Sequence, residues 1–546
     1  MSEKSENKIL ELSEEDKNRL AKFEVSLDAI DTKKTWQLLG SFWNFGTFRK
    51  GVSDLTGKKI ITTFSENPSF PIYAHDEWKS DKWDSLSYGR DYDFSKPFFL
   101  QLAELQKLVP HPHQFGAMNT NCDWASDVWH SKNCYLSRTL LECEDVDYGF
   151  RLVGSKRSVD ITYSFDLERC YDCLYCYKSY RLQHGIDSRD CVDSFFLYDC
   201  RNCSDCFMSW GLRNKQYCIK NVQHTKEEYK KIIASMDLGS RSARRKLKEE
   251  FMEHIKKDAF HRENHNVQTK NSSGNYLSHD NNCRECYFVE ESENCLATAR
   301  CLGCKDLICS FGPLKSEEGY LIAMGGYNYG SMATLFCTNC RYSYYLDACE
   351  ECEYCFGCVG LEKKKYCILN KQYTKEEYES LVEKIKSAMK TDGSWGEFFP
   401  KNMAYSEYNN SFGSFYYPLT DEEIVSLGFR YDKKENAVYD GIDPETLPDN
   451  IKDVTDEISK IQLICPVTGK KFGIAPQELA FYKSENIPLP VHYFDYRTKE
   501  RFKPFSSLSS FAGNCAICKK SITHFYPPEW GYENVLCLDC YQKEVS

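Results

Sequence analysis

Four cysteines near the end of the chain have the spacing of a metal site. Cys515 and Cys518 are separated by two residues, as are Cys537 and Cys540, and eighteen residues lie between the pairs. Two such pairs bring four thiolates to one Zn²⁺ ion, each at about 2.3 Å, and the β-forming residues between them make the hairpin of a zinc ribbon. Four thiolates leave no open coordination position. The spacing therefore predicts one structural zinc ion, and no catalytic residue is assigned.

A second set of cysteines lies in the middle of the chain, where C-x-x-C-x-x-C runs begin at Cys170, Cys200 and Cys349, the last extended by Cys358. We favour a packed ladder of buried thiols, because cysteine is among the most fully buried residue types. An alternative is a metal site that pools thiolates from neighbouring runs. The pairs that could pool are Cys283 with Cys286, and Cys301 with Cys304. An iron–sulfur cluster is favoured least, because no run is followed by x-x-x-C-P.

The central cysteines belong to a duplicated module. Residues 217–229 read YCIKNVQHTKEEY and residues 366–378 read YCILNKQYTKEEY, a constant offset of 149 positions. Six cysteines recur at the same offset: Cys134, Cys191, Cys200, Cys203, Cys206 and Cys218 correspond to Cys283, Cys340, Cys349, Cys352, Cys355 and Cys367. The two copies are therefore expected to share one fold.

A shorter repeat lies inside the first copy. The run that begins at Cys170 recurs thirty positions later at Cys200, and the neighbouring serine, phenylalanine and leucine residues recur with it. A unit of this length without a helical stripe predicts a β-solenoid, in which equivalent residues of successive coils stack about 4.8 Å apart. The predicted fold class is mixed and β-rich: a duplicated, cysteine-rich, β-solenoid-like repeat module with inserted helices, flanked by zinc-ribbon-like β domains.

Each copy of the module is predicted to close with a helix. Thr225 is followed three residues later by Glu228, and Thr374 by Glu377, and both pairs have the pattern of a capping box. Further helices are expected over residues 8–24, 97–109 and about 240–257, and after Thr420. The basic start of the third of these, RSARRKLK, is the only concentrated positive patch.

Two other segments resemble the C-terminal ribbon. Residues 56–59 and 468–471 both read TGKK, as at the turn of a ribbon hairpin. Where the ribbon has cysteines, the first segment has Ser53, Ala74 and Glu77, and the second has Cys465. Residues 50–80 are therefore predicted to form a ribbon-like fold without a metal, and Cys465 to be a buried thiol.

Composition limits the classes of function. The net charge of −11 supplies no global basic field for nucleic acid or anionic lipid. The longest apolar runs are far below membrane-spanning length, and the charged N-terminus lacks an apolar signal core, so a cytoplasmic location without membrane association is expected. In that compartment 29 cysteines do not predict a disulfide framework. P-loop, HExxH, GxSxG and dinucleotide motifs are absent from the sequence, which disfavours an enzyme.

The chain is expected to divide into six consecutive parts. These are an N-terminal helix (1–30), a degenerate ribbon-like β domain plus helix (31–118), the first module copy with closing helices (119–260), the second copy with its closing helix (261–390), an aromatic connector and linker (391–460), and a C-terminal domain with the zinc ribbon (461–546). His261 and His265 lie four positions apart, but without a third ligand nearby we interpret them as surface residues.

The chain resembles a family of cysteine-rich, zinc-ribbon-containing bacterial proteins that has no established activity. The matching stretches include TGKKIITTF, NCYLSRTLLECEDVDYGF, QYCIKN with the TKEEY helix, GEFFPKN through PLTDEEIVSLGF, FGIAPQELAFYKSENIPLP, and the terminal cysteines. The resemblance covers nearly the whole chain, and its implication is architectural. At the first ribbon this sequence departs from the family pattern, because the expected cysteines are missing.

We expect a non-enzymatic scaffold or binding protein, with the zinc ribbon as a docking module for a protein or an RNA-containing assembly. Arg497, Arg501 and Lys503 would form a local basic rim beside the ribbon. Nucleic acid would be contacted only through such a local basic patch. The alternative is a thiol-rich metal-binding or iron–sulfur redox protein, which would hold many metal ions per chain.

Overall fold

The computed structural model describes residues 9–46, 48–65, 67–312, 317, 319–432, 441–503 and 507–545. The chain divides into two compact units, each built from two separate stretches of sequence. Unit 1 comprises Met1–Phe115 and Asn264–Asp432, and unit 2 comprises Gly116–Glu263 and Lys433–Ser546. The two module copies therefore lie in different units.

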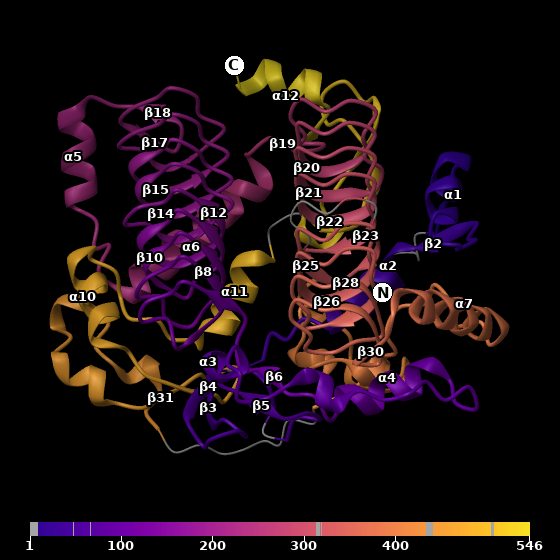
Figure 1. Cartoon of the computed structure of the whole chain (residues 1–546). Coiled ribbons are helices and arrows are strands. Elements are labelled where there is room, and N and C mark those ends of the chain that lie inside the picture. Colours follow the sequence, from indigo (N-terminus) through magenta and orange to yellow (C-terminus); the bar gives the residue numbers. More distant parts are fainter. Residues whose placement is uncertain are drawn as a thin grey trace. The chain divides into compact units, whose positions relative to one another are not determined.

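Each unit contains one large sheet whose strands follow one another in chain order (Figure 1). The 12-stranded sheet of unit 2 consists of β7 (Gly116–Ala117), β8 (Ala125–Trp129), β9 (Ser137–Leu141), β10 (Glu144–Asp147), β11 (Phe150–Val153), β12 (Lys156–Phe165), β13 (Tyr171–Leu174), β14 (Tyr180–Ile186), β15 (Val192–Tyr198), β16 (Phe207–Trp210), β17 (Cys218–Ile219) and β18 (Val222–Gln223). The 11-stranded sheet of unit 1 consists of β20 (Gly274–Ser278), β21 (Cys286–Glu290), β22 (Leu296–Leu302), β23 (Ile308–Phe311), β24 (Tyr320–Ile322), β25 (Met324–Gly326), β26 (Met332–Thr338), β27 (Tyr344–Asp347), β28 (Glu353–Phe356), β29 (Lys365–Ile368) and β30 (Lys371–Gln372).

The strands pair in parallel at a step of twelve residues. Leu182 on β14 pairs with Ser194 on β15, and Cys355 on β28 pairs with Cys367 on β29. Only the last pair of each sheet is antiparallel. A parallel connection of so few residues leaves no room for a crossover helix, so the chain itself must turn back within each step.

The backbone turns at every third residue. Positive φ angles recur at Asp187, Asp190, Asp193, Phe196 and Asp199, with values between 44° and 57°. Aspartate and asparagine tolerate this left-handed conformation better than most residues, which explains why they recur along the module. Asp160 also has a positive φ angle, so the acidic residues that recur along the sequence lie at turns.

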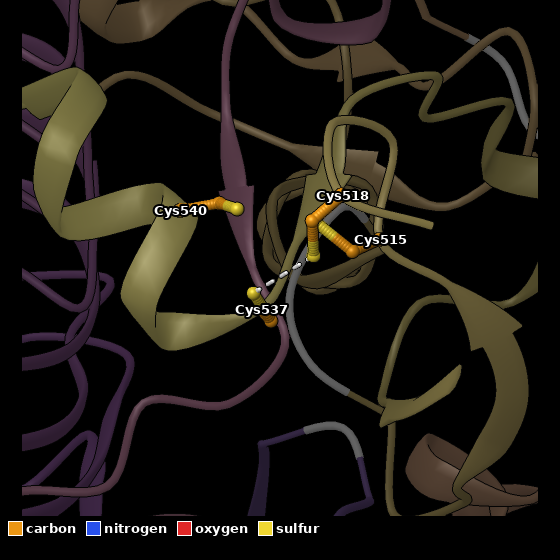
Figure 2. Close-up of side chains that lie close together, drawn as sticks. All are labelled: Cys515, Cys518, Cys537 and Cys540. Carbon is orange, nitrogen blue, oxygen red and sulfur yellow. Dashed lines mark hydrogen bonds between the residues drawn. The ribbon is translucent and has the colours of Figure 1, made fainter. Parts of the chain in front are cut away.

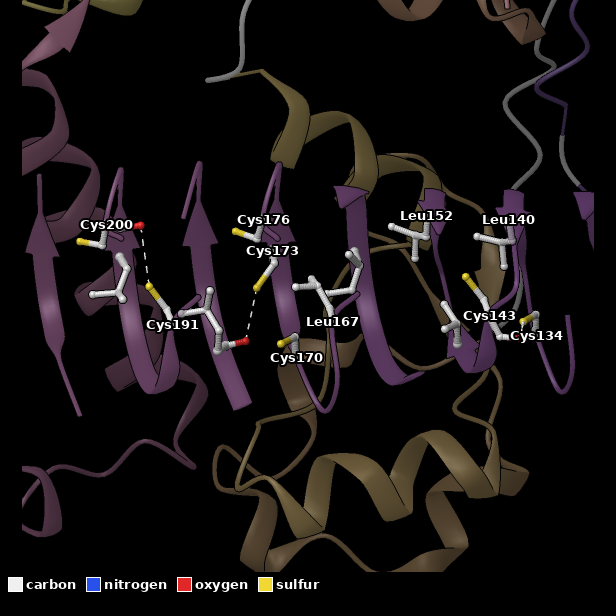
Figure 3. Packing of buried hydrophobic residues seen from close by; sticks show 14 of the residues in the cluster. Cys134, Leu140, Cys143, Leu152, Leu167, Cys170, Cys173, Cys176, Cys191 and Cys200 are labelled. Atoms are coloured by element: carbon white, nitrogen blue, oxygen red, sulfur yellow. Dashed lines mark hydrogen bonds between the residues drawn. The ribbon is translucent and has the colours of Figure 1, made fainter. Parts of the chain in front are cut away.

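Small side chains fill the interior at the same period of three. In unit 2, Leu167, Cys170, Cys173 and Cys176 belong to one buried cluster (Figure 3). Three residues of strand span only about 10 Å at 3.3 Å per residue. The interior is therefore narrow, and it selects Cys, Ser, Gly, Val and Leu over aromatic residues.

Inward serine and cysteine side chains also bind the backbone. The Ser158 hydroxyl donates to the Lys156 carbonyl at 2.8 Å and accepts from the Cys170 N–H at 3.1 Å. The Cys170 thiol lies 3.4 Å from the carbonyl oxygens of both Glu168 and Ser179. These contacts satisfy backbone groups that the turns remove from the strand ladder.

The predicted stacking at thirty residues is wrong. Backbone partners lie twelve positions apart, as Ile161 and Cys173 do, so Cys170 does not stack on Cys200. Cysteine pairs that are twelve apart do meet: the Cys134 N–H lies 3.4 Å from the Cys122 sulfur. Thirty is a multiple of three but not of twelve. Residues thirty apart therefore both point inward, but they are not backbone partners.

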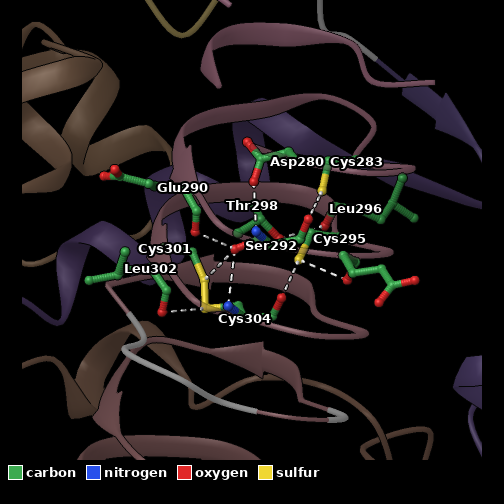
Figure 4. Close-up of a disulfide and its surroundings, with 11 residues drawn as sticks. Asp280, Cys283, Glu290, Ser292, Cys295, Leu296, Thr298, Cys301, Leu302 and Cys304 are labelled. Carbon is green, nitrogen blue, oxygen red and sulfur yellow. Dashed lines mark hydrogen bonds between the residues drawn. A yellow bond between two sulfur atoms is a disulfide. The ribbon is translucent and has the colours of Figure 1, made fainter. Parts of the chain in front are cut away.

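One pair of interior cysteines is oxidised. Cys301 and Cys304 in unit 1 are joined by a disulfide (Figure 4), and every other cysteine has a free thiol. The bond spans only two intervening residues, so it closes no long loop.

The remaining helices and strands cover and connect the large sheets. In unit 1 these are α1 (Glu14–Ala21), α2 (Thr32–Ser41), α3 (His75–Trp78), α4 (Phe98–Gln106), α7 (Lys375–Thr391), α8 (Gly413–Tyr416), α9 (Asp421–Ser426), β1 (Ile9–Glu11), β2 (Ala29–Asp31), β3 (Arg49–Val52), β4 (Lys59–Thr62), β5 (Ile72–Tyr73) and β6 (His111–Pro112). In unit 2 they are α5 (Lys226–Ala234), α6 (Arg241–Lys257), α10 (Pro476–Ser484), α11 (Phe494–Phe502), α12 (Leu538–Val545), β19 (His261–Arg262), β31 (Leu463–Ile464), β32 (Lys471–Phe472), β33 (Phe511–Asn514), β34 (Ser521–His524) and β35 (Val535–Leu536).

The helices predicted from capping signals are confirmed. α5 and α7 begin after Thr225 and Thr374, both with complete capping boxes, and α9 begins after Thr420 in the same way. The helix α6 matches the range expected for it, and α4 lies within its expected range but is shorter. The first helix is shorter than predicted, because Ser13 caps α1 and residues 9–11 form a strand instead. No helix in the described ranges is both long and apolar enough to cross a membrane.

The narrow interior makes a prediction about packing. A Cβ atom added to Gly185 would lie 3.0 Å from the Cys176 sulfur and 2.5 Å from Leu182 Cδ2, so no space is spare. We expect Cys176→Leu to lower the free energy of unfolding by about 1–3 kcal/mol through overpacking. The control Lys178→Leu, at an exposed turn, should change it by less than about 0.5 kcal/mol. Equal effects in urea titrations of the two variants would contradict the inward assignment.

Candidate metal centre

The first cysteine pair lies on the turn of a hairpin. Strands β33 and β34 pair antiparallel from Asn514 with Ser521 outward. In the turn, the Cys515 N–H donates to the Lys520 carbonyl at 2.8 Å, and the Lys519 N–H donates to the Cys515 carbonyl at 3.0 Å. This tight turn brings the Cys515 and Cys518 side chains to one side of the hairpin (Figure 2).

The second pair lies where a strand meets a helix. Cys537 follows β35 directly, and Cys540 lies in the first turn of α12. The sequence thus places both pairs in local structures suited to metal binding.

The four sulfur atoms converge. All lie within 4.8 Å of one another, and the sulfurs of Cys518 and Cys537 are 3.7 Å apart (Figure 2). Sulfurs bound tetrahedrally to zinc at about 2.3 Å would be about 3.8 Å apart. Cys518 is exposed, and the other three cysteines are buried. This group could hold a metal ion, and its donor set is compatible with zinc.

In the part of the chain that the structure describes, this is the one group of three or more Cys, His, Asp or Glu side chains whose donor atoms converge in this way. The thiols of the central runs instead contact backbone carbonyls. These backbone contacts satisfy the thiols within the chain and support the packed-thiol interpretation.

The segment that carries the four cysteines is attached to the module of unit 2. Its strand β35 pairs in parallel with β19, and the Leu538 N–H donates to Glu263 at 3.0 Å. Tyr541 contacts Asp199 through a hydrogen bond and accepts one from Arg213 at 2.8 Å. A metal ion that holds the two cysteine pairs together would therefore also fix α12 against the module.

Two further hairpins repeat the turn of the metal centre. The N–H of Ser53 donates to the Lys58 carbonyl at 2.8 Å, and that of Cys465 donates to the Lys470 carbonyl at 3.0 Å. Both match the contact made by Cys515. The likeness inferred from the TGKK motifs thus extends to the backbone of these turns.

At the first hairpin, polar side chains occupy three of the four positions that correspond to the terminal cysteines, and Ala74 occupies the fourth. The hydroxyls of Ser53 and Thr56 both donate to the Glu77 carboxylate, and the Ala74 N–H donates to Ser53 Oγ at 3.1 Å. Hydrogen bonds here join the same two chain segments that four thiols join at the ribbon. Cys465, at the second hairpin, is fully buried as predicted, and its sulfur lies 3.9 Å from Nδ1 of His492.

The predicted basic rim is wrong. Arg501 is buried and pairs with both Asp160 and Asp172 at 2.8 and 2.7 Å, and Arg497 pairs with Asp160 at 3.1 Å. Only Lys503 of the three is mainly exposed, and it pairs with Glu500. Asp160 and Asp172 are twelve residues apart, so they share one ladder of the sheet, and α11 crosses that ladder. The spacing of twelve was the sequence signal that could have revealed these pairs.

The basic helix and the histidines also differ from expectation. Arg244 of α6 is buried and donates to the Leu238 carbonyl, while Arg241 donates to the Leu447 carbonyl at 3.1 Å. His261 and His265 are buried, not on the surface. His261 lies 2.7 Å from the Tyr198 hydroxyl through Nδ1. Arg241 and Arg244 therefore make internal contacts, and less positive charge is left for a surface patch.

Comparisons with known proteins returned no match. No family model, curated protein or solved structure matches the chain. The resemblance inferred from the sequence is therefore matched by none of these comparisons.

The cluster at Glu77 predicts a pH dependence for unit 1. The hydrogen bond from Ser53 is the main cause that lowers the Glu77 pKa from its usual value of 4.5. A lowered pKa in the folded state adds stability above the unfolded pKa, and this stability is lost as the pH falls through the folded value. We therefore expect the melting temperature of the wild type to fall more steeply than that of Glu77→Gln between pH 5 and pH 3.

The control is Glu351→Gln, an exposed glutamate of the same unit, which should keep the slope of the wild type. Parallel curves for Glu77→Gln and the wild type would show that Glu77 does not carry this dependence.

Proposed function

We propose that the chain is a non-enzymatic binding scaffold of the cytoplasm, built from two β-solenoids and a C-terminal ribbon that holds one structural zinc ion. The observation that carries the zinc assignment is the convergence of four thiols whose sulfurs all lie within 4.8 Å of one another. The parallel step of twelve and the turn at every third residue support coils of four short sides.

A solenoid supports a binding role because it repeats outward side chains in straight rows. Asn121 donates to Asn133 at 3.0 Å, and Asn133 donates to Asp145 at 2.7 Å, each twelve residues further on. Rows of this kind present an extended and regular surface to a partner.

The partner is more readily a protein than an RNA-containing assembly. The net charge is −11, and Arg497 and Arg501, which were expected to form a basic rim, are paired within the chain. Binding to nucleic acid would need unpaired cations along a surface. The zinc ribbon, through Cys518 and its exposed turn, remains the proposed docking module.

Metal content tests the zinc assignment. We expect purified wild type to contain one zinc ion per chain by mass spectrometry, because one group of thiols converges. Cys537→Ser should reduce the content well below one. The control Cys465→Ser, which removes a buried thiol outside the group, should leave it at one. Many metal ions per chain, or iron with bound sulfide, would favour the thiol-rich metal-binding or redox alternative.

Affinity capture tests the docking role. Wild-type chain immobilised at native salt should retain a stable partner, and Cys515→Ser with Cys518→Ser should lose it because the ribbon unfolds without metal. The same control, Cys465→Ser, should retain it. Absence of any stable partner together with turnover of a substrate would overturn the proposal.

A further inference from the structure

Unit 2 contains a second site, a pocket of about 630 Å³ on the side of the large sheet. Helix α10 forms one wall, with Gln477, Phe481 and Ser484. Strands β10 and β12 and the turns beside them form the other. The volume is that of a small-molecule site. The pocket is separate in sequence and composition from the metal centre.

Asp147 is the unusual residue of this pocket. It lines the pocket, yet only 7% of its surface is exposed. Its neighbours in the sheet register are Tyr135 on one side and Val159 on the other, neither of which carries a charge. Among the described residues, none donates a hydrogen bond to the Asp147 carboxyl or forms an ion pair with it. Buried carboxylates are normally paired, so the lack of a partner makes Asp147 unusual.

The surrounding charges do not supply that partner. Asp145, Asp160 and Glu478 are the acidic groups that act on Asp147, and Arg497 is the basic one. Arg497 already pairs with Asp160 at 3.1 Å.

The two arginines that line the pocket are also paired, Arg169 with Glu485 and Arg157 with Glu168. Burial, together with the nearby carboxylates, raises the pKa of Asp147 well above its usual range. The pocket is thus short of positive charge at its buried end.

The other lining residues favour an organic cation over a metal ion. Trp124, Tyr135 and Phe481 contribute aromatic rings. Aromatic faces attract alkylammonium groups and cover their carbon stems. A bare divalent ion needs several converging oxygen ligands, and no such group is found here among the described residues.

We propose that this pocket binds a small organic cation with a primary ammonium group, which pairs with the Asp147 carboxylate, while its alkyl stem lies along the rings of Tyr135 and Phe481. The site does not depend on the proposed scaffold role, because none of its residues belongs to the ribbon. Failure of this proposal would leave the zinc assignment unchanged.

Calorimetric titration of the full-length, metal-loaded chain at pH 8 tests the proposal. The probe is 1,5-diaminopentane, and its neutral match is 1,5-pentanediol. We expect the diamine to bind with one site per chain and the diol not to bind. Asp147→Asn should weaken diamine binding at least tenfold. The control Asp190→Asn removes an exposed carboxylate of the same sheet and should bind as the wild type does.

Stability separates a binding role from a structural one. Without ligand, Asp147→Asn should melt at or above the temperature of the wild type, because it removes an unpaired buried charge. A lower melting temperature with unchanged diamine binding would overturn the proposal. If Asp147→Asn does not fold, Asp145→Asn at the exposed rim replaces it in the titration. This variant should weaken diamine binding two- to fivefold. The proposal is contradicted if the variant that folds binds the diamine as tightly as the wild type does. It is also contradicted if the wild type does not bind the diamine.

Discussion

The parallel register of twelve residues is the constraint on which the rest of the molecule depends. It requires the chain to turn four times in each step, so every third residue adopts a positive φ and every third side chain faces a narrow interior. That interior admits thiols, hydroxyls and small aliphatic groups. Ser158 and Cys170 show why polar examples are tolerated: each binds the backbone groups that the turns leave open. The abundance of cysteine in the module thus follows from packing, without a need for metal.

Local signals in the sequence predicted local structure well. Thr225 and Thr374 marked helix starts, and the C-x-x-C pairs marked the convergent thiols. The step of twelve was missed because the visible repeat is thirty residues, which is ten turns of three but two and a half steps. Residues thirty apart therefore both point inward, but they are offset by half a step and do not pair. The burial of Arg501 was missed for the same reason, since its partners Asp160 and Asp172 come together only at the true step.

The three hairpins show how one backbone turn carries different chemistry. The turns at Ser53, Cys465 and Cys515 share the same hydrogen bond to the residue five positions on. At Ser53 the crossing segment supplies Glu77, which accepts hydrogen bonds, and at Cys515 it supplies thiols. A stable hairpin tolerates this exchange because either arrangement joins the two segments. The capacity to hold a metal ion would therefore depend on the side chains at this fold position and not on the backbone turn.

The central claim is that the module cysteines pack while the four C-terminal cysteines bind metal. Peptide-mapped alkylation of native protein, before and after a strong zinc chelator, tests this most directly. The account predicts that the chelator exposes Cys515, Cys518, Cys537 and Cys540 together, while Cys170, Cys200 and the other module cysteines react only after denaturation. Release of the module cysteines by the chelator, with the C-terminal four unchanged, would contradict it.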